Sequence, residues 1–125
     1  MYEVFVAATF EAAHRLKGDF GPATRTHGHT YRLEAMVRGD DLADDGTLVD
    51  IGELREAVDD LAASLHYRDL DEVPGLAGKN TTAEVVAGFC WGRISPSLQN
   101  RGLSSLTVRV WESPQVYAAR EEALD

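Results

Sequence analysis

The sequence predicts a single α+β domain over residues 1–125, with two helices on one face of an antiparallel four-stranded sheet. Three observations support this fold class. Apolar residues alternate near both ends of the chain, as is typical of half-buried strands. Two amphipathic segments lie between those strands, and capping residues precede each one. The resulting order of strand, strand, helix, helix, strand, strand favours both helices on one face of the sheet.

The first two strands are expected at residues 2–14 and 30–39, separated by a glycine- and proline-containing loop over 16–26. Side chains two apart in a strand share a face, so alternating apolar residues mark the buried side. These residues are Tyr2, Val4 and Val6 in the first strand, and Tyr31, Leu33, Ala35 and Val37 in the second.

Two helices are predicted over 51–65 and 83–94. Asp50 is a good N-cap for the first helix, and Glu53 completes a capping-box pattern. Thr81 and Glu84 give the same signal ahead of the second helix. The residues expected on the apolar faces are Ile51, Leu54, Val58, Leu61 and Leu65, then Val85, Val86, Phe89 and Ile94.

Two further strands are expected at 105–113 and 116–120, the first with Leu106, Val108 and Val110 on one face. A four-stranded sheet leaves two edges whose backbone groups are unpaired. Joining subunits edge to edge into a closed barrel removes those edges, so we expect the protein to be an oligomer.

Charge and cysteine content narrow the classes of partner. Acidic residues outnumber basic ones by 21 to 12, giving a net charge of −9, which argues against a nucleic-acid partner. No apolar run is long enough to cross a bilayer, so we expect no membrane partner. Cys90 is the only cysteine, which excludes an intrachain disulfide and favours a cytoplasmic location.

Three of the four histidines form a pattern that suggests a metal site. His27 and His29 lie just before the second predicted strand and point to the same face if the chain there is extended, and His14 ends the preceding strand, where it can lie opposite them. Three neutral imidazoles with an open fourth position are the ligand set of catalytic zinc sites. The alternative is that His27 and His29 are ordinary exposed strand residues, since the H-x-H pattern is common by chance.

Five segments in order resemble the 6-pyruvoyltetrahydropterin and 6-carboxytetrahydropterin synthase family: FEAAHRL, HGHTY, VDIGELR, NTTAE and VRVWES. The resemblance implies the tunnelling fold, in which strands of several subunits close into a barrel, commonly as a homohexamer. It also implies that His14, His27 and His29 bind Zn²⁺. In the family the metal holds side-chain hydroxyls of a 7,8-dihydroneopterin-type substrate and acts as a Lewis acid.

The resemblance further implies three residues that bind the pterin. Glu112 matches the family's pterin-anchoring glutamate, and a carboxylate can accept two parallel hydrogen bonds from the 2-amino and N3 edge of a pterin. Thr81 and Thr82 match the block that lines the same pocket. The alternatives are an exposed strand-end residue for Glu112 and helix capping for the threonines.

The acid–base residues depart from the family pattern. Ala23 occupies the position of the family's cysteine and can neither accept nor donate a proton. His66 and Tyr67 occupy the positions of the family's Asp-His pair, and Asp69 is close enough in sequence to orient His66. The base is therefore His66, Tyr67 or a hydroxide on the zinc, while His66 can equally be a plain helix-end residue. Cys90 is expected to be a buried structural thiol.

Two functions follow from this pattern. The first is a zinc-dependent lyase that acts on a 7,8-dihydroneopterin or its triphosphate with altered acid–base residues. The second is a non-catalytic zinc- and pterin-binding protein that serves as a carrier, sensor or assembly partner. The zinc and pterin residues fit both functions. An intact three-histidine site with an open position favours the enzyme.

Overall fold

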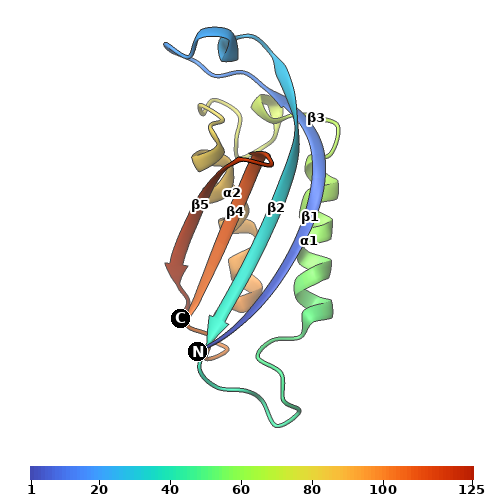
Figure 1. The fold of residues 1–125 in the computed structure, drawn as a ribbon, viewed down its shortest axis with the longest axis vertical. Helices are drawn as coiled ribbons and strands as arrows, with labels where there is room; N and C mark the ends of the chain where they lie inside the picture. The colour runs from blue at the N-terminus through green and yellow to red at the C-terminus, as the bar shows by residue number, and fades with distance from the viewer.

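The computed structural model describes all 125 residues and contains one five-stranded sheet in the order β3-β1-β2-β4-β5. Both helices lie on the same side of this sheet (Figure 1). The strands are β1 Tyr2–His14, β2 His27–Gly39, β3 Arg68–Asp69, β4 Ser105–Ser113 and β5 Val116–Ala123. The predicted α+β class and the placement of the helices are confirmed.

The predicted number of four strands is wrong, because β3 adds a fifth. This strand has two residues and pairs in parallel with Ala12 and Ala13 of β1. Such a short strand has no apolar alternation to reveal it. The other strand pairs, β1 with β2, β2 with β4 and β4 with β5, are antiparallel.

The helices are α1 Ile51–Leu65 and α2 Ala83–Ile94, with short 3₁₀ turns η1 Gly21–Thr24, η2 Leu70–Glu72 and η3 Ser95–Leu98. As predicted, the Asp50 carboxylate caps α1 by accepting hydrogen bonds from the first-turn amides. The cap of α2 is Thr82 rather than Thr81, and its hydroxyl accepts the Val85 amide at 3.2 Å. The hydroxyl of Thr81 donates a hydrogen bond to the Asp71 carboxylate instead.

The core lies between the helices and the sheet. Helix α1 packs on β1, while α2 packs on β4 and β5 and is fixed by Trp91, whose indole N–H donates to the Leu106 carbonyl at 2.8 Å. The predicted strand residues Tyr31, Leu33, Ala35, Val37, Leu106, Val108 and Val110 are all fully buried. Ile51, by contrast, is 57% exposed because it is the first residue of its helix and lies beside the preceding loop.

The second helix buries a wider face than the one predicted. Val85 and Phe89 are half-buried, while Ala87, Cys90 and Trp91 are buried with Val86 and Ile94. Burial raises the pKa of the Cys90 thiol to about 12, as expected of a structural cysteine. Neither helix combines the length and hydropathy needed to cross a bilayer.

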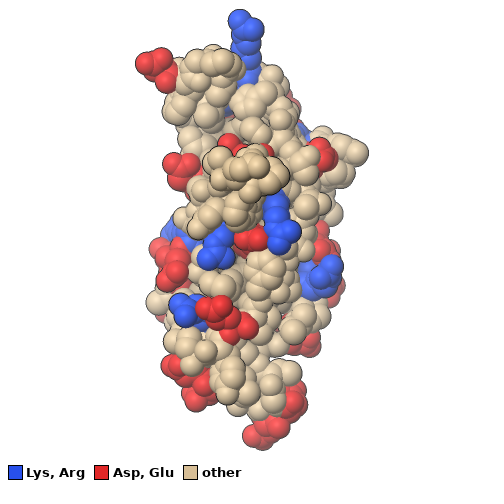
Figure 2. All heavy atoms as spheres, in the orientation of Figure 1, with Lys and Arg blue, Asp and Glu red and all other residues tan.

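Acidic and basic side chains are interspersed on the face of the molecule shown in Figure 2, which displays no broad basic patch. Several of the basic groups are paired, including Arg32 with Glu34 at 2.8 Å and Arg38 with Glu3 at 3.1 Å.

Candidate metal centre

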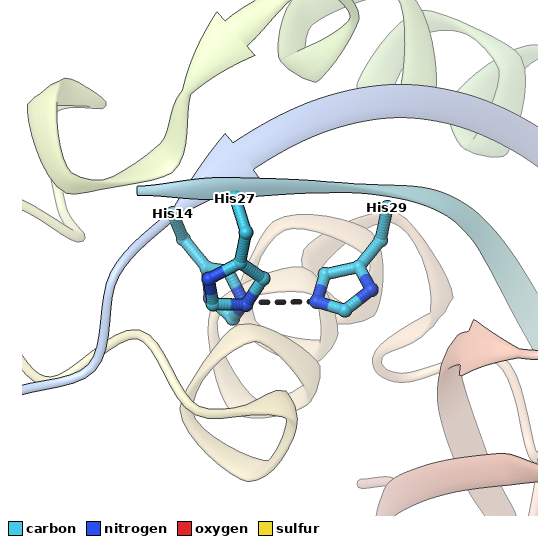
Figure 3. A group of neighbouring side chains, drawn as sticks. All are labelled: His14, His27 and His29. Atoms are coloured by element: carbon cyan, nitrogen blue, oxygen red, sulfur yellow. Dashed lines mark hydrogen bonds between the residues drawn. The ribbon is translucent and has the colours of Figure 1, made fainter. Parts of the chain in front are cut away.

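Three histidine side chains converge at one end of the sheet, where β1 ends and β2 begins (Figure 3). The register pairs His14 with His27 and Ala12 with His29, so all three imidazoles project from the face that carries the helices. Their ring centroids are 4.6, 4.9 and 5.1 Å apart. The structure therefore brings together all three predicted metal ligands.

The outer nitrogens of two rings are held by backbone carbonyls. Nδ1 of His14 lies 2.7 Å from the Thr81 oxygen, and Nδ1 of His27 lies 2.7 Å from the Arg25 oxygen. A carbonyl can only accept, so each Nδ1 carries the proton and each Nε2 keeps its lone pair free. This arrangement is how proteins orient histidines that bind metals.

The spacing of the ligand nitrogens fits a tetrahedral metal. Zn–N bonds of 2.0–2.1 Å in tetrahedral geometry place two ligand nitrogens about 3.3 Å apart, and Nε2 of His14 and Nε2 of His29 are 3.2 Å apart. All three rings offer nitrogens within 4.8 Å of one another. The donor set of three imidazoles fits zinc.

Glu112 lies beside this cluster on β4. Glu112 directly follows Trp111, the last β4 residue paired with β2, and lies at a β-bulge between Trp111 and Ser113; its charge and its backbone both act on the His29 imidazole. Burial lowers the pKa of His29, and the nearby Glu112 charge partly offsets that effect by favouring the imidazolium. The half-buried carboxylate is therefore an electrostatic neighbour of the metal-binding face.

Tyr31 lies beneath the histidines and is a site residue that the sequence did not single out. Its ring stacks on Phe10 at 4.9 Å and lies 5.3 Å from the His29 ring. The side chain is fully buried, yet its hydroxyl has no hydrogen-bond partner. Burial raises the pKa of Tyr31 well above its usual range, and the charges of Glu112 and Asp71 add to this shift. The sequence did offer one indication of this role: Tyr31 lies two residues after His29, so the two side chains share a face of the strand.

The two predicted threonines have different environments. Thr81 is fully buried, with its hydroxyl donating to Asp71 at 2.9 Å and its carbonyl on His14. Thr82 is half-buried at the start of α2. Thr81 thus lies behind the metal cluster, whereas Thr82 is the more accessible of the pair.

The predicted acid–base residues lie apart from the imidazoles within one chain. His66 ends α1, and its Nδ1 accepts the Glu11 amide at 3.0 Å. Tyr67 is 81% exposed and stacks on His66 at 3.8 Å. The Asp69 carboxylate caps η2 by accepting the Asp71 amide. None of the three belongs to the cluster of potential metal ligands.

A cavity of about 490 Å³ adjoins Tyr67 and Asp69 and reaches His29. Its floor includes Ala13 and Gly28, which pair across β1 and β2. Because side chains alternate along strands, this pair belongs to the face opposite the three imidazoles. The register pairs Asp69 with Ala13, so Asp69 lies on that opposite face, whereas Tyr67 borders the cavity at the edge of the sheet.

Ala23 lies in the 3₁₀ turn η1 of the loop between β1 and β2 and is half-buried. Its amide donates to Phe20 and its carbonyl accepts the Leu16 amide, so its backbone holds the loop closed. A methyl side chain adds no acid–base group to the metal centre.

An α+β sheet with both helices on one face and three imidazoles at one end defines a protein of the tunnelling-fold class. The family model described as 6-pyruvoyl tetrahydropterin synthase matches residues 3–123. The chain belongs to this family.

The sequence comparisons give two informative relatives. The chain is 32% identical over 103 residues to the 6-pyruvoyl tetrahydrobiopterin synthase of Dictyostelium discoideum, covering 73% of this chain and 76% of that protein. It is 27% identical to the 6-carboxy-5,6,7,8-tetrahydropterin synthase of Haemophilus influenzae, over 98% of this chain and 100% of that protein. The relatives thus include both named types of synthase.

The structure is also similar to a solved 6-pyruvoyl tetrahydropterin synthase from Caenorhabditis elegans. The TM-score is 0.82 at 22% identity, over 97% of this chain and 95% of that chain. The corresponding enzyme of Plasmodium falciparum gives a TM-score of 0.83 at 20% identity, over 98% of each chain. These likenesses establish the fold.

Proposed function

We propose that the protein is a zinc-dependent enzyme of pterin metabolism, a lyase of the tetrahydropterin synthase type that acts on a 7,8-dihydroneopterin or its triphosphate. The observation that carries the proposal is the convergence of three imidazoles beside the Glu112 carboxylate. The family membership supports the same substrate class.

In this proposal His14, His27 and His29 hold the zinc, which when bound supplies Lewis acidity to a substrate hydroxyl. Glu112 accepts paired hydrogen bonds from the 2-amino and N3 edge of the pterin. Thr82 is the better placed of the two threonines to contact the substrate, because its hydroxyl proton remains available while its oxygen caps α2. Thr81 reaches the substrate only through His14.

Within one chain, the site lacks a residue that is well placed to act as the general base. Nδ1 of His66 already accepts a backbone amide, so its proton lies on Nε2, which then has no lone pair to act as a base. Tyr67 is exposed to solvent and lies outside the cluster of imidazoles. We propose that a neighbouring chain contributes to the pocket in a homohexamer, consistent with the pocket shared between subunits that the family resemblance implies.

A second function is a zinc- and pterin-binding protein without turnover. Two observations favour it: Ala23 brings no acid–base group, and the hydrogen bond at His66 occupies the nitrogen that a base would need. The metal and pterin residues are the same in both proposals, so only product formation separates them.

The test begins with metal content and products. The purified protein is expected to hold about one zinc per chain, and His27→Ala/His29→Ala is expected to lose it. His66→Ala is the matched control, since this histidine lies outside the cluster and its loss should leave the zinc in place. Full occupancy in the double variant overturns the metal assignment.

The zinc-loaded protein is then incubated with 7,8-dihydroneopterin and its triphosphate, and the products are identified by mass spectrometry. Side-chain cleavage or loss of phosphate supports the enzyme. Binding without any product supports the carrier or sensor. Absence of both binding and product refutes a pterin-related function.

A further inference from the structure

We infer that Asp71 and Thr81 form a positioning unit that fixes the ring of His14 and thereby sets the metal affinity of the centre. The inference rests on the proposed function in one respect, namely that His14 is a metal ligand. Asp71 and Thr81 are positioning residues, since both act through His14.

The geometry links the three residues in one chain of contacts. The Asp71 carboxylate accepts the Thr81 hydroxyl at 2.9 Å through Oδ1. The carbonyl of the same threonine holds Nδ1 of His14 at 2.7 Å. The group that orients the imidazole is therefore itself fixed by the carboxylate.

The second oxygen of Asp71 secures the other side of the histidine. Oδ2 accepts the backbone amide of Arg15 at 2.9 Å, and Arg15 directly follows His14 at the end of β1. One carboxylate thus restrains both the backbone beside His14 and the acceptor of its ring. His14 is the deepest of the three ligands, with 1% of its surface exposed, so its ring depends on protein contacts rather than on solvent.

Burial makes these contacts costly to lose. Thr81 is fully buried, and a buried hydroxyl without a partner is destabilising. Removing the hydroxyl leaves an oxygen of Asp71 without its donor, and the η2 segment is then free to shift away from α2. Thr81, which directly precedes the Thr82 cap of α2, is then no longer tied to η2, so its carbonyl shifts and Nδ1 of His14 loses its aligned acceptor.

The alternative is a purely structural role, in which Asp71 and Thr81 only connect η2 to the start of α2. A neighbouring residue provides a matched control for that alternative. Thr82 caps α2 with the same side chain, and Asp69 caps η2 with the same carboxylate, yet neither contacts a histidine of the cluster. Thr82→Val therefore removes local stability without touching His14, whereas Asp69 holds the Asp71 amide and is no independent control.

The experiment measures the zinc dissociation constant of the full chain by competition with a chromophoric chelator. Thr81→Val and Asp71→Asn are expected to weaken zinc binding by about 10- to 100-fold, the usual loss on removing an outer partner of a metal-bound histidine. Thr81→Ser keeps the hydroxyl and is expected to restore wild-type affinity. Thr82→Val is expected to stay within about twofold of wild type, even where its melting temperature falls.

A spectroscopic readout reports on His14 directly. Long-range ¹H–¹⁵N spectra of the metal-free protein are expected to show the Nδ1-protonated tautomer of His14 in the wild type. Thr81→Val and Asp71→Asn are expected to show a mixture of tautomers, whereas Thr82→Val keeps one. If Thr81→Val fails to fold, Asp71→Asn provides both measurements, because an amide retains only one of the two acceptor oxygens.

Wild-type zinc affinity together with a single His14 tautomer in both variants overturns the inference and leaves the proposed function intact. A wild-type protein that binds no zinc refutes the proposed metal centre instead. In that case the tautomer spectra still decide whether Asp71 and Thr81 position His14.

Discussion

Replacing Glu112 by glutamine tests how the site recognises its ligand. The glutamine keeps the length and shape of the side chain but presents an N–H where the carboxylate presents an acceptor. Facing the 2-amino and N3 edge of a pterin, that N–H meets another donor. The substitution therefore removes one hydrogen bond, introduces a repulsive contact and eliminates the negative charge.

The magnitude follows from the setting of the carboxylate. Glu112 is half-buried, so the paired hydrogen bonds proposed for it would be screened less than surface contacts, and losing them should cost about 2–4 kcal/mol. That energy weakens pterin binding by about 30- to 1,000-fold. Calorimetric titration of the zinc-loaded protein with 7,8-dihydroneopterin measures the change.

Zinc content is the internal control for this variant. The Glu112 charge raises the pKa of His29, so its removal lowers that pKa and keeps the imidazole neutral. The metal should therefore remain bound in Glu112→Gln. Glu121→Gln, on the exposed edge strand, is the matched substitution and should bind pterin as the wild type does. Unchanged pterin affinity in Glu112→Gln would place the ligand elsewhere.

Two further outcomes follow from buried groups. Cys90 should remain unmodified by Ellman's reagent at pH 8 in the folded protein, because burial raises the pKa of its thiol to about 12. The same thiol should react fully in denaturant. Rapid reaction of the native protein would contradict this prediction. Tyr31→Phe removes a buried hydroxyl that has no partner, so urea denaturation of the metal-free protein should show unchanged or higher stability, by up to about 1 kcal/mol. A loss of stability would reveal a hydrogen bond that the structure does not contain.

The elements predicted well are those whose signal is periodic. The apolar alternation around Leu33 and Val108 gave the strands, and the cap at Asp50 gave the start of α1. The last strand extends to Ala123 rather than residue 120 because it is an exposed edge, where charged residues are tolerated and the alternation fades. Strand β3 has too few residues to show any period.

For the site as well, features set by local spacing could be predicted from the sequence, whereas features set by contacts between distant segments could not. Spacing alone placed His27 and His29 on one face, since a strand fixes that geometry. The bond between Thr81 and Asp71, and the contact of Thr81 with His14, join segments that the sequence gives no means of pairing. His66 illustrates the converse, because its closeness to Asp69 in the sequence suggested an orienting contact, whereas its Nδ1 accepts the Glu11 amide instead.

The assembly prediction depends on the two edges of the sheet. Strand β5 is an edge along its whole length, and β1 is covered by β3 only at Ala12 and Ala13. Successive amides of a strand point to opposite sides, so of Ala118 and Ala119 one faces β4 and the other faces the free edge. Proline at the inward position removes a hydrogen bond within the sheet and should destabilise the fold, whereas proline at the outward position leaves the chain folded and blocks pairing with another subunit. Circular dichroism identifies which of Ala118→Pro and Ala119→Pro keeps the native fold. Light scattering is then expected to show an oligomer for the wild type and a smaller species for that folded variant. A monomeric wild type at micromolar concentration, or a folded proline variant with the mass of the wild type, would show that the β5 edge does not join the subunits.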